Sequence, residues 1–227
     1  MTFRFPLFRK KKKMTDLTII GTGNMARGLA ARAVAAGRSV QLLAHEDRAK
    51  AEALATELGG TITPGVLGDQ LTGAMVIPAV YFDASRAIAE QYGDALHGKV
   101  YVDLTNPVDF ATFDSLSVPA DSSAAEELQK VTGAKVVKAF NTTFAATLAD
   151  GTVAGHPLDV LIAGDDADAI QAVAGFASAA GLNPVVVGPQ RRARQLEHMG
   201  FLHILLSASD ELPAYQWNSA LNVIPAA

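Results

Sequence analysis

Short apolar runs alternate with segments of helical periodicity from residue 16 to about residue 180. The runs are rich in valine, isoleucine and leucine and are bounded by glycine, proline or polar residues, as expected for buried strands. We expect strands at 17–20, 39–43, 74–78, 100–104, 135–140, 159–163 and 184–187, and a weak one at 61–62. We expect helices at 24–36, 47–58, 81–96, 122–131, 166–179 and 190–207.

The first strand leads through a glycine turn directly into a helix. Gly21 permits a tight turn, Gly23 allows close approach of a pyrophosphate, and Ala26 is small enough for close packing of helix on strand. The N-terminus of the helix presents free N–H groups and the positive end of a dipole to an anion. The strand–turn–helix context therefore favours a nucleotide-binding turn over an ordinary connection.

Repeated alternation of strand and helix predicts an α/β fold with a doubly wound parallel sheet of the Rossmann type. We expect the last long helix to form a small C-terminal helical addition to it. The predicted parts are a disordered basic extension (1–14), a dinucleotide-binding Rossmann domain (15–188) and a C-terminal helical or dimerisation segment (189–227).

Charge and composition narrow the classes of partner. Six of the 19 basic residues lie among the first 13 positions, and the rest of the chain has 13 basic and 23 acidic residues, a net charge of −10. This balance argues against nucleic acid as the main partner. Without cysteine there is no thiolate metal site, and no apolar run is long enough to cross a bilayer. We therefore expect a cytoplasmic protein with no transmembrane segment, and we assign no metal ligands.

The residues after the second strand bear on the choice between NAD and NADP. Glu46 could hold a ribose diol, as acids do in NAD sites, whereas His45, Arg48 and Lys50 could surround a 2′-phosphate. A purely structural alternative is that Glu46 or Asp47 caps the following helix and that Arg48 and Lys50 lie on its solvated face. The residues alone leave these alternatives open.

Several further strand ends carry candidates for the same crevice, because the carboxyl ends of parallel strands meet at one edge of a sheet. Asparagine offers a carboxamide that can bind ribose hydroxyls or a nicotinamide amide, although it also forms turns. The candidates are Ile77, Pro78, Ala79, Asn106, Pro107 and Asn141.

Four motifs, in order along the chain, resemble the F420-dependent NADP oxidoreductases, and the cytosolic domains of STEAP-type ferric reductases are similar. The resemblance covers about residues 15–207. The motifs are Gly21-Thr22-Gly23-Asn24-Met25, Asp103-Leu104-Thr105-Asn106-Pro107, Lys138-Ala139-Phe140-Asn141-Thr142, and Gly188-Pro189 followed by Ala193-Arg194-Gln195-Leu196-Glu197.

The resemblance implies a homodimeric Rossmann protein that moves a hydride between NADP(H) and a deazaflavin (F420), with the flavins FMN or FAD used by relatives. It implies that Thr22, Gly23, Asn24 and Met25 hold the pyrophosphate. By the same resemblance, Ile77, Pro78 and Ala79 run beside the ribose on the nicotinamide side. Asn141 would lie near the nicotinamide and the acceptor as a positioning residue, and we assign no catalytic acid or base. The chain departs from the family at His45-Glu46, where serine or arginine followed by arginine is common.

Two alternatives remain from other classes of protein. The first is an NAD(P)H-dependent reductase of a small imine or carbonyl, a class whose members carry a longer helical C-terminal domain than the segment after Val187. The second is a non-catalytic NADP(H)-binding redox sensor, supported by the altered His45-Glu46 pair and the basic N-terminal segment. Turnover with any acceptor would exclude the sensor.

Overall fold

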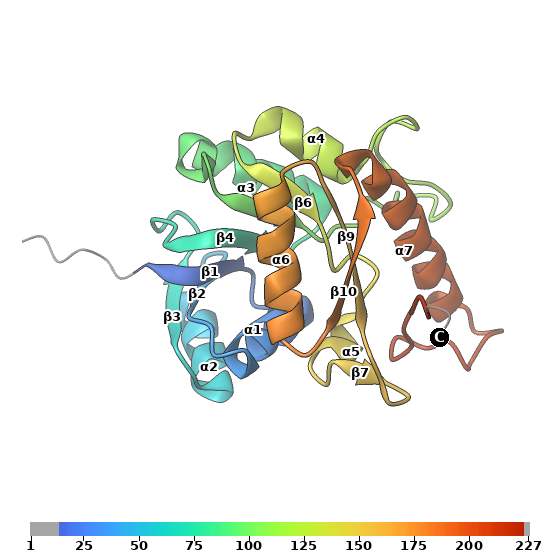
Figure 1. Cartoon of the computed structure of the whole chain (residues 1–227), viewed down its shortest axis with the longest axis horizontal. Helices are drawn as coiled ribbons and strands as arrows, with labels where there is room; N and C mark the ends of the chain where they lie inside the picture. The colour runs from blue at the N-terminus through green and yellow to red at the C-terminus, as the bar shows by residue number, and fades with distance from the viewer. Residues whose placement is uncertain (1–13, 225–227) are drawn as a thin grey trace, which may run out of the picture.

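A computed structural model describes residues 14–224, so the basic extension predicted for residues 1–14 lies outside the described residues except for Met14. The described chain forms one large sheet with helices on both faces and a small separate hairpin (Figure 1). The strands of the large sheet are β1 (Thr15–Ile20), β2 (Val40–Ala44), β3 (Ile62–Val66), β4 (Gly73–Pro78), β5 (Val100–Asp103), β6 (Lys135–Lys138), β9 (Asp159–Gly164) and β10 (Asn183–Gly188). The hairpin is β7 (Thr152–Val153) with β8 (His156–Pro157). The helices are α1 (Asn24–Ala35), α2 (Arg48–Leu58), α3 (Phe82–Tyr92), α4 (Ala124–Val131), α5 (Ala145–Leu148), α6 (Ala167–Ala179) and α7 (Ala193–Ala208), with 3-10 turns η1 (Gly93–Leu96) and η2 (Gln190–Arg192).

The sheet has the order β3-β2-β1-β4-β5-β6-β9-β10, which confirms the Rossmann-type doubly wound fold. Its first six strands are parallel, and the order reverses between β1 and β4. The expectation of a wholly parallel sheet is wrong for the last two strands, because β9 pairs with β6 in the antiparallel sense. The connection from β6 to β9 contains only the short α5 and the β7–β8 hairpin, with no long crossover helix to return the chain to the other edge.

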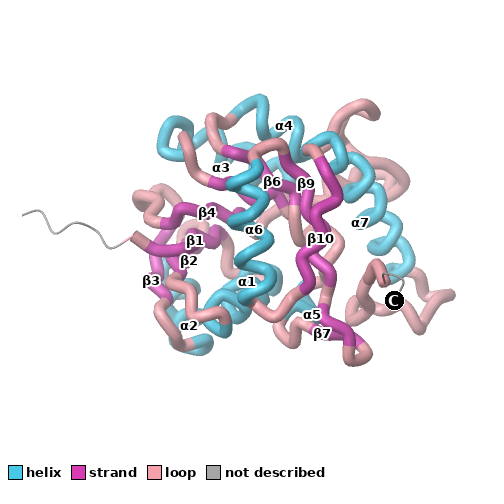
Figure 2. The backbone as a smooth tube through the Cα atoms, in the orientation of Figure 1, coloured by secondary structure: helices cyan, strands magenta, loops and turns pink. Residues whose placement is uncertain are grey.

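The core lies in two layers, one on each face of the sheet. Ile19 belongs to the layer covered by α1 and α6, and its neighbour Ile20 to the layer covered by α3 and α4. This follows from the alternation of side chains along a strand, and it explains why the central strands are apolar at most of their positions. Figure 2 shows that the long segment between β5 and α4 has no helix.

Three elements differ from the sequence-based expectation for local reasons. The weak strand at 61–62 is the full-length β3, which includes Pro64 and Gly65 and lies at the edge of the sheet, where proline is tolerated. The helix expected at 81–96 ends at Tyr92, because Gly93 has a positive φ and the rest is a 3-10 turn. The strand expected to reach Phe140 ends at Lys138.

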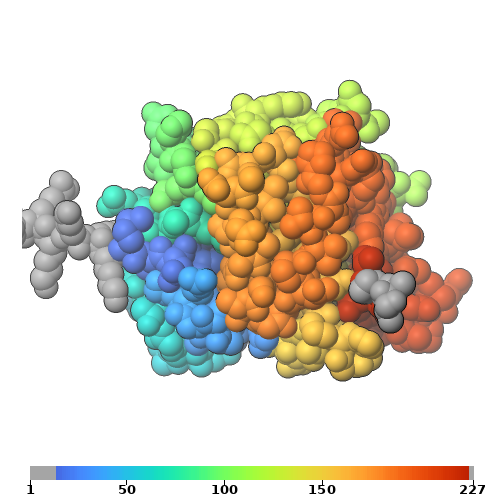
Figure 3. Space-filling model, in the orientation of Figure 1, coloured from blue at the N-terminus to red at the C-terminus, as the bar shows by residue number. Residues whose placement is uncertain are grey.

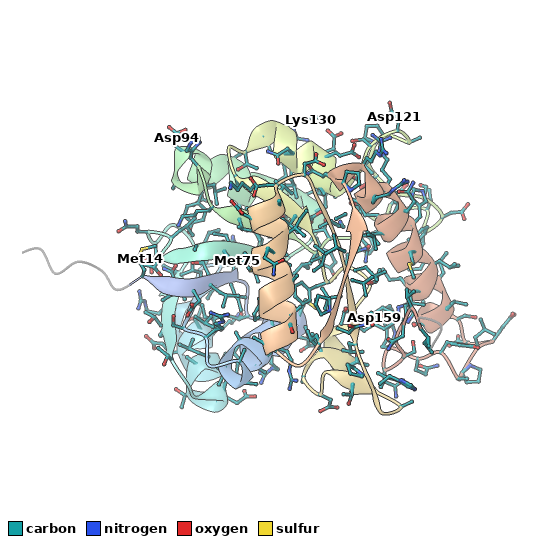
Figure 4. All side chains as sticks on the ribbon, viewed as in Figure 1. Met14, Met75, Asp94, Asp121, Lys130 and Asp159 are labelled. Carbon is teal, nitrogen blue, oxygen red and sulfur yellow. The ribbon has the colours of Figure 1, made fainter. Side chains whose placement is uncertain are left out.

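The C-terminal helix α7 is attached to the sheet through α4. The guanidinium of Arg194 donates two hydrogen bonds to the Glu126 carboxylate, at 2.8 and 2.6 Å, so this arginine anchors the helical addition to α4. Beyond α7, the red C-terminal segment returns toward the rest of the chain (Figure 3). There Val223 N donates over 2.6 Å to Oδ2 of Asp159, the β9 residue labelled in Figure 4. Within residues 14–224, no helix is both long enough and apolar enough to cross a membrane.

Two glycine substitutions test how tightly the switch point is packed. A Cβ at Gly73 would lie 2.3 Å from Thr18 N in β1, whereas one at Gly175 in α6 would meet no described atom within 4 Å. We expect Gly73→Ala to lower the free energy of unfolding by about 1–3 kcal/mol through overpacking. Gly175→Ala, the matched control, should raise it by about 0.5–1 kcal/mol, because glycine is a poor helix former. Urea unfolding measures both, and equal effects of the two substitutions would contradict the tight β1–β4 contact.

Candidate functional site: the carboxyl edge at the β1–β4 switch point

The glycine turn after β1 lies between the loops that follow β2 and β4. Gly21 has φ +117°, and a Cβ there would lie 2.9 Å from Ala79 O, so only glycine fits. Gly21 N donates to Leu43 O at the end of β2, and Ala79 N donates to Ile20 O, both over 2.8 Å. The turn therefore joins three strand ends at the reversal point, where doubly wound sheets bind ligands.

The N-terminus of α1 begins in this turn without a side-chain cap. Gly23 is the N-cap residue, in extended conformation, and no side chain of the described residues accepts from the first turn. The first turn also contains no acid, and a Cβ at Gly23 would meet no described atom within 4 Å. The helix thus presents uncapped N–H groups and an uncompensated dipole to open space, a suitable arrangement for an anion.

Behind the turn, α1 packs closely on its surroundings. Ala26 is fully buried against the sheet, and a Cβ at Gly28 would lie 3.1 Å from Leu148 in α5. Thr22 and Met25 are half-buried and Asn24 is exposed, so the four residues assigned to the pyrophosphate share one accessible turn. Their binding role stays a prediction.

The residues predicted to determine the preference for NAD or NADP lie on the surface after β2. Asp47 caps α2, since its Oδ1 accepts from Ala49 N, which confirms one of the two structural alternatives. Arg48 donates to Asp69 Oδ2 and to Pro64 O, each over 3.2 Å. His45, Glu46 and Lys50 are exposed. In the described residues the guanidinium of Arg48 is therefore directed to a carboxylate, which the local sequence did not indicate.

On the other side of the turn, β4 ends in buried Ile77 and Pro78, followed by half-buried Ala79. Pro78 is in register with Ile20, so these residues directly flank the glycine turn. The sequence-based prediction that the two loops line one crevice is consistent with this register.

The strand ends of β5 and β6 bring Asn106 and Asn141 together. Asn106 Nδ2 donates to Asn141 O over 2.7 Å, and Asn141 Nδ2 donates to Asn106 Oδ1 over 2.9 Å and to Leu196 O over 2.8 Å. Asn141 is 6 % exposed, yet its Oδ1 has no partner among the described residues. A buried amide oxygen without a donor is costly, so this atom is suited to receive a hydrogen bond from a ligand.

The backbone before Asn141 is strained. Phe140 has φ +66°, a left-handed conformation that is rare for a bulky residue, and it ends β6 sharply. Such conformations persist where the surrounding structure holds them, and they are concentrated at functional sites. Pro107, assigned to the same edge, is buried beside this turn.

A cluster of buried charges lies directly behind the two asparagines. Lys138 Nζ donates to Asp103 Oδ2 (2.8 Å), Glu197 Oε1 (2.7 Å) and Thr105 O (2.5 Å), and all three charged side chains are inaccessible to solvent. Glu197 thereby anchors α7 to the end of β6. The role of Lys138 and Asp103 was missed, although each is a charged residue at the end of an apolar strand, which is the signal that could have found them.

The charged groups of this cluster shift the pKa values of Lys138 and Glu197. Burial alone would lower the pKa of Lys138, but the charges of Asp103 and Glu197 outweigh burial and raise it. Burial and the charge of Asp103 raise the pKa of Glu197, against the opposing effect of Lys138. Both oxygens of Glu197 accept hydrogen bonds, Oε1 from Lys138 and Oε2 from Ala124 N at the start of α4. The geometry therefore suits an ionised Glu197, whose charge is further stabilised by the N-terminus of α4.

Aromatic side chains surround the edge. Tyr81 follows β4 and Phe110 follows β5, with ring centroids 5.5 Å apart in an edge-to-face arrangement, and they are 74 % and 64 % exposed. On the far side of Asn141, Phe144 stacks on His203 of α7, with ring centroids 4.0 Å apart. It also packs against Trp217, with ring centroids 5.1 Å apart. The C-terminal segment thus packs beside the loop that carries Asn141.

Comparisons with known proteins agree with this architecture. Residues 16–107 match the family described as NADP oxidoreductase, coenzyme F420-dependent. The chain is 33 % identical to a hypothetical protein, SMa0349, from Sinorhizobium meliloti, with a TM-score of 0.69 over 78 % of this chain and 86 % of that one. It shares the fold of an Arthrobacter sp. FB24 protein assigned provisionally as an F420-dependent NADP-reductase (24 % identity, TM-score 0.76, 93 % and 100 % of the two chains).

A curated relative is the metalloreductase STEAP3 of Rattus norvegicus, 29 % identical over 187 residues, or 82 % of this chain. The match spans about a third (36 %) of the length of that relative. The family match covers the glycine turn and the strand ends of β2, β4 and β5, whereas Asn141, Lys138 and Glu197 lie outside it. These matches support the resemblance to the F420-dependent NADP oxidoreductases that the four sequence motifs indicated.

Proposed function

We propose that the protein transfers a hydride between NADP(H) and a planar deazaflavin or flavin acceptor at the carboxyl edge of its sheet. The observation that carries the proposal is the uncapped N-terminus of α1 at the switch point, with Gly21 fitted against Ala79 and open space over Gly23. In dinucleotide-binding folds this arrangement receives the pyrophosphate. The residues assigned to it are Thr22, Gly23, Asn24 and Met25.

The nicotinamide end fits the pair of asparagines. A nicotinamide carries a carboxamide whose N–H groups need an acceptor, and Asn141 Oδ1 is a buried acceptor without a donor among the described residues. When bound, NADPH supplies the hydride from C4 of its nicotinamide. Asn141 then fixes the rotation of the ring, while Ile77, Pro78 and Ala79 flank the adjoining ribose. Holding two rings in the reactive geometry is the main task in such a transfer, so no acid or base of the chain is required.

The opposite end of the nucleotide would lie over β2. His45 and Lys50 are exposed there, and Arg48 lies next to them, although it binds Asp69 in the described structure. These three residues support a 2′-phosphate, whereas Glu46 would repel it. We propose NADP(H) as the preferred cofactor because Arg48 and Lys50 lie at this end and the matching family model is one of NADP oxidoreductases.

The exposed aromatic pair supports a planar acceptor. Tyr81 and Phe110 follow the two strands on the half of the edge that we assign to the nicotinamide, and large exposed aromatic side chains commonly mark binding surfaces. A flat tricyclic ring could stack on one of them and contact the edge of the other. A small imine or carbonyl would use little of this surface.

The proposal is tested by anaerobic oxidation of NADPH and, separately, of NADH, with F420, FMN, FAD and no acceptor. We expect oxidation of NADPH with at least one of the three acceptors, with NADPH favoured over NADH by about tenfold or more in kcat/KM, since one lost phosphate contact is worth 1–3 kcal/mol. Tight binding of NADPH without turnover by any acceptor would contradict the proposal and favour a redox sensor. Turnover only with imines or ketones would favour the small-molecule reductase.

A substitution at the N-cap of α1 separates cofactor binding from stability. Gly23→Asp supplies α1 with a capping carboxylate, so the free energy of unfolding should stay the same or rise by up to about 1 kcal/mol. The same carboxylate would repel the pyrophosphate, and the Kd for NADP⁺, measured by calorimetry, should rise by about 100-fold or more. Gly175→Asp makes the same substitution in α6 and should leave the Kd unchanged. An unchanged Kd in Gly23→Asp would place the nucleotide elsewhere.

A further inference from the structure

We propose that the buried cluster of Lys138, Asp103 and Glu197 is a positioning device that holds the carboxamide of Asn141 in a single orientation at the cofactor edge. The role of that orientation in hydride transfer rests on the proposed function. The orientation itself is a property of this chain's hydrogen bonds, and it can be tested without any cofactor.

The cluster joins three segments that are distant in the sequence. Lys138 ends β6, Asp103 ends β5, and Glu197 lies in the first turns of α7, with Thr105 O as the third acceptor. An ammonium has three N–H donors, and here each has one acceptor. Asp103 Oδ1 also accepts from the backbone N and the hydroxyl of Thr105, which fixes the loop after β5. The charged hydrogen bonds therefore fix the relative position of β5, β6 and α7 at this edge.

Each partner of Asn141 is the direct neighbour of a residue held by this cluster. Asn106, whose Oδ1 accepts from Asn141 Nδ2, follows Thr105 in the sequence. Leu196, whose carbonyl accepts the second hydrogen bond of Asn141 Nδ2, precedes Glu197. A displacement of either segment relative to β6 would therefore break one of the two bonds that orient the amide.

These hydrogen bonds determine which end of the Asn141 amide is left as an acceptor. Because both N–H groups of Asn141 are used, the amide cannot flip without losing two hydrogen bonds, and Oδ1 remains the end without a donor among the described residues. The left-handed Phe140 adds strain to the same turn. A strained turn with an unsatisfied buried acceptor needs support from its surroundings, and the three segments fixed by Lys138 supply it.

The side chain of Glu197 is the part of the device that can be changed most safely. Replacement by leucine leaves Lys138 paired with Asp103, a neutral buried pair. It removes the acceptor of one Lys138 N–H and of Ala124 N, and so releases the links of α7 to β6 and to the start of α4. Glu126→Gln is the matched control, because it weakens the other link between α4 and α7, the pair with Arg194, without touching the cluster.

The first measurement is hydrogen exchange of the Asn141 side-chain amide by NMR on the full chain. We expect a protected amide in the wild type and in Glu126→Gln, and exchange faster by about tenfold or more in Glu197→Leu. If Glu197→Leu does not fold, Glu197→Gln, which keeps the shape but loses the charge, should show a smaller acceleration in the same direction. Protection that persists in the folded Glu197 variants would overturn the proposal.

The second measurement is a double-mutant cycle in the hydride-transfer assay. Glu197→Leu should lower kcat by about tenfold and change the Kd for NADP⁺ by less than about threefold, because the pyrophosphate site is intact. In an Asn141→Ala background the same substitution should have almost no further effect on kcat, since the two residues act as one unit. Additive losses would overturn the positioning role. Faster amide exchange in a protein that shows no hydride transfer at all would refute the proposed function and leave the positioning device in place.

Discussion

The ammonium of Lys138 is the point on which the arrangement of the carboxyl edge depends. It is fully buried, and its three N–H groups bind Asp103, Glu197 and a backbone carbonyl, so it links two neighbouring strands and the C-terminal helix. Removing one partner of such a cluster would leave a buried charge uncompensated. The C-terminal helix is therefore attached to the sheet by charged hydrogen bonds as well as by apolar contact, and the attachment lies next to Asn141.

The two halves of the edge are built by different means. Around β1, β2 and β4 the edge is formed by the backbone, since the fit of Gly21 against Ala79 and the uncapped start of α1 require no charged side chain. Around β5 and β6 it is formed by side chains, namely the asparagine pair and the charged residues behind it. This division matches the proposed ligand, because a pyrophosphate needs N–H groups and an open approach, whereas a neutral nicotinamide needs one well-oriented acceptor.

The features that could be predicted from the sequence are those that depend on residues close together in the chain. The strand, glycine turn and helix between residues 15 and 35 are adjacent in the chain, and so are Asp47 and the helix that it caps. The pairs that determine the site are distant in the sequence, since Lys138 is 35 positions from Asp103 and 59 positions from Glu197. For the same reason the pairing of Arg48 with Asp69 was not foreseen. The direction of β9 was also missed, since strand–helix alternation alone does not distinguish a parallel from an antiparallel return.

The most direct test of the central claim is a crystal structure of the full chain with NADP⁺ bound. We expect the pyrophosphate at the first turn of α1 and the carboxamide nitrogen of the nicotinamide at about 3 Å from Asn141 Oδ1, a normal hydrogen-bond distance. We also expect Asn141 to keep its hydrogen bonds to Asn106 and Leu196, and Lys138 to keep its three partners. A nicotinamide turned away from Asn141, or an Asn141 amide that has exchanged its partners, would refute the proposed role of Asn141.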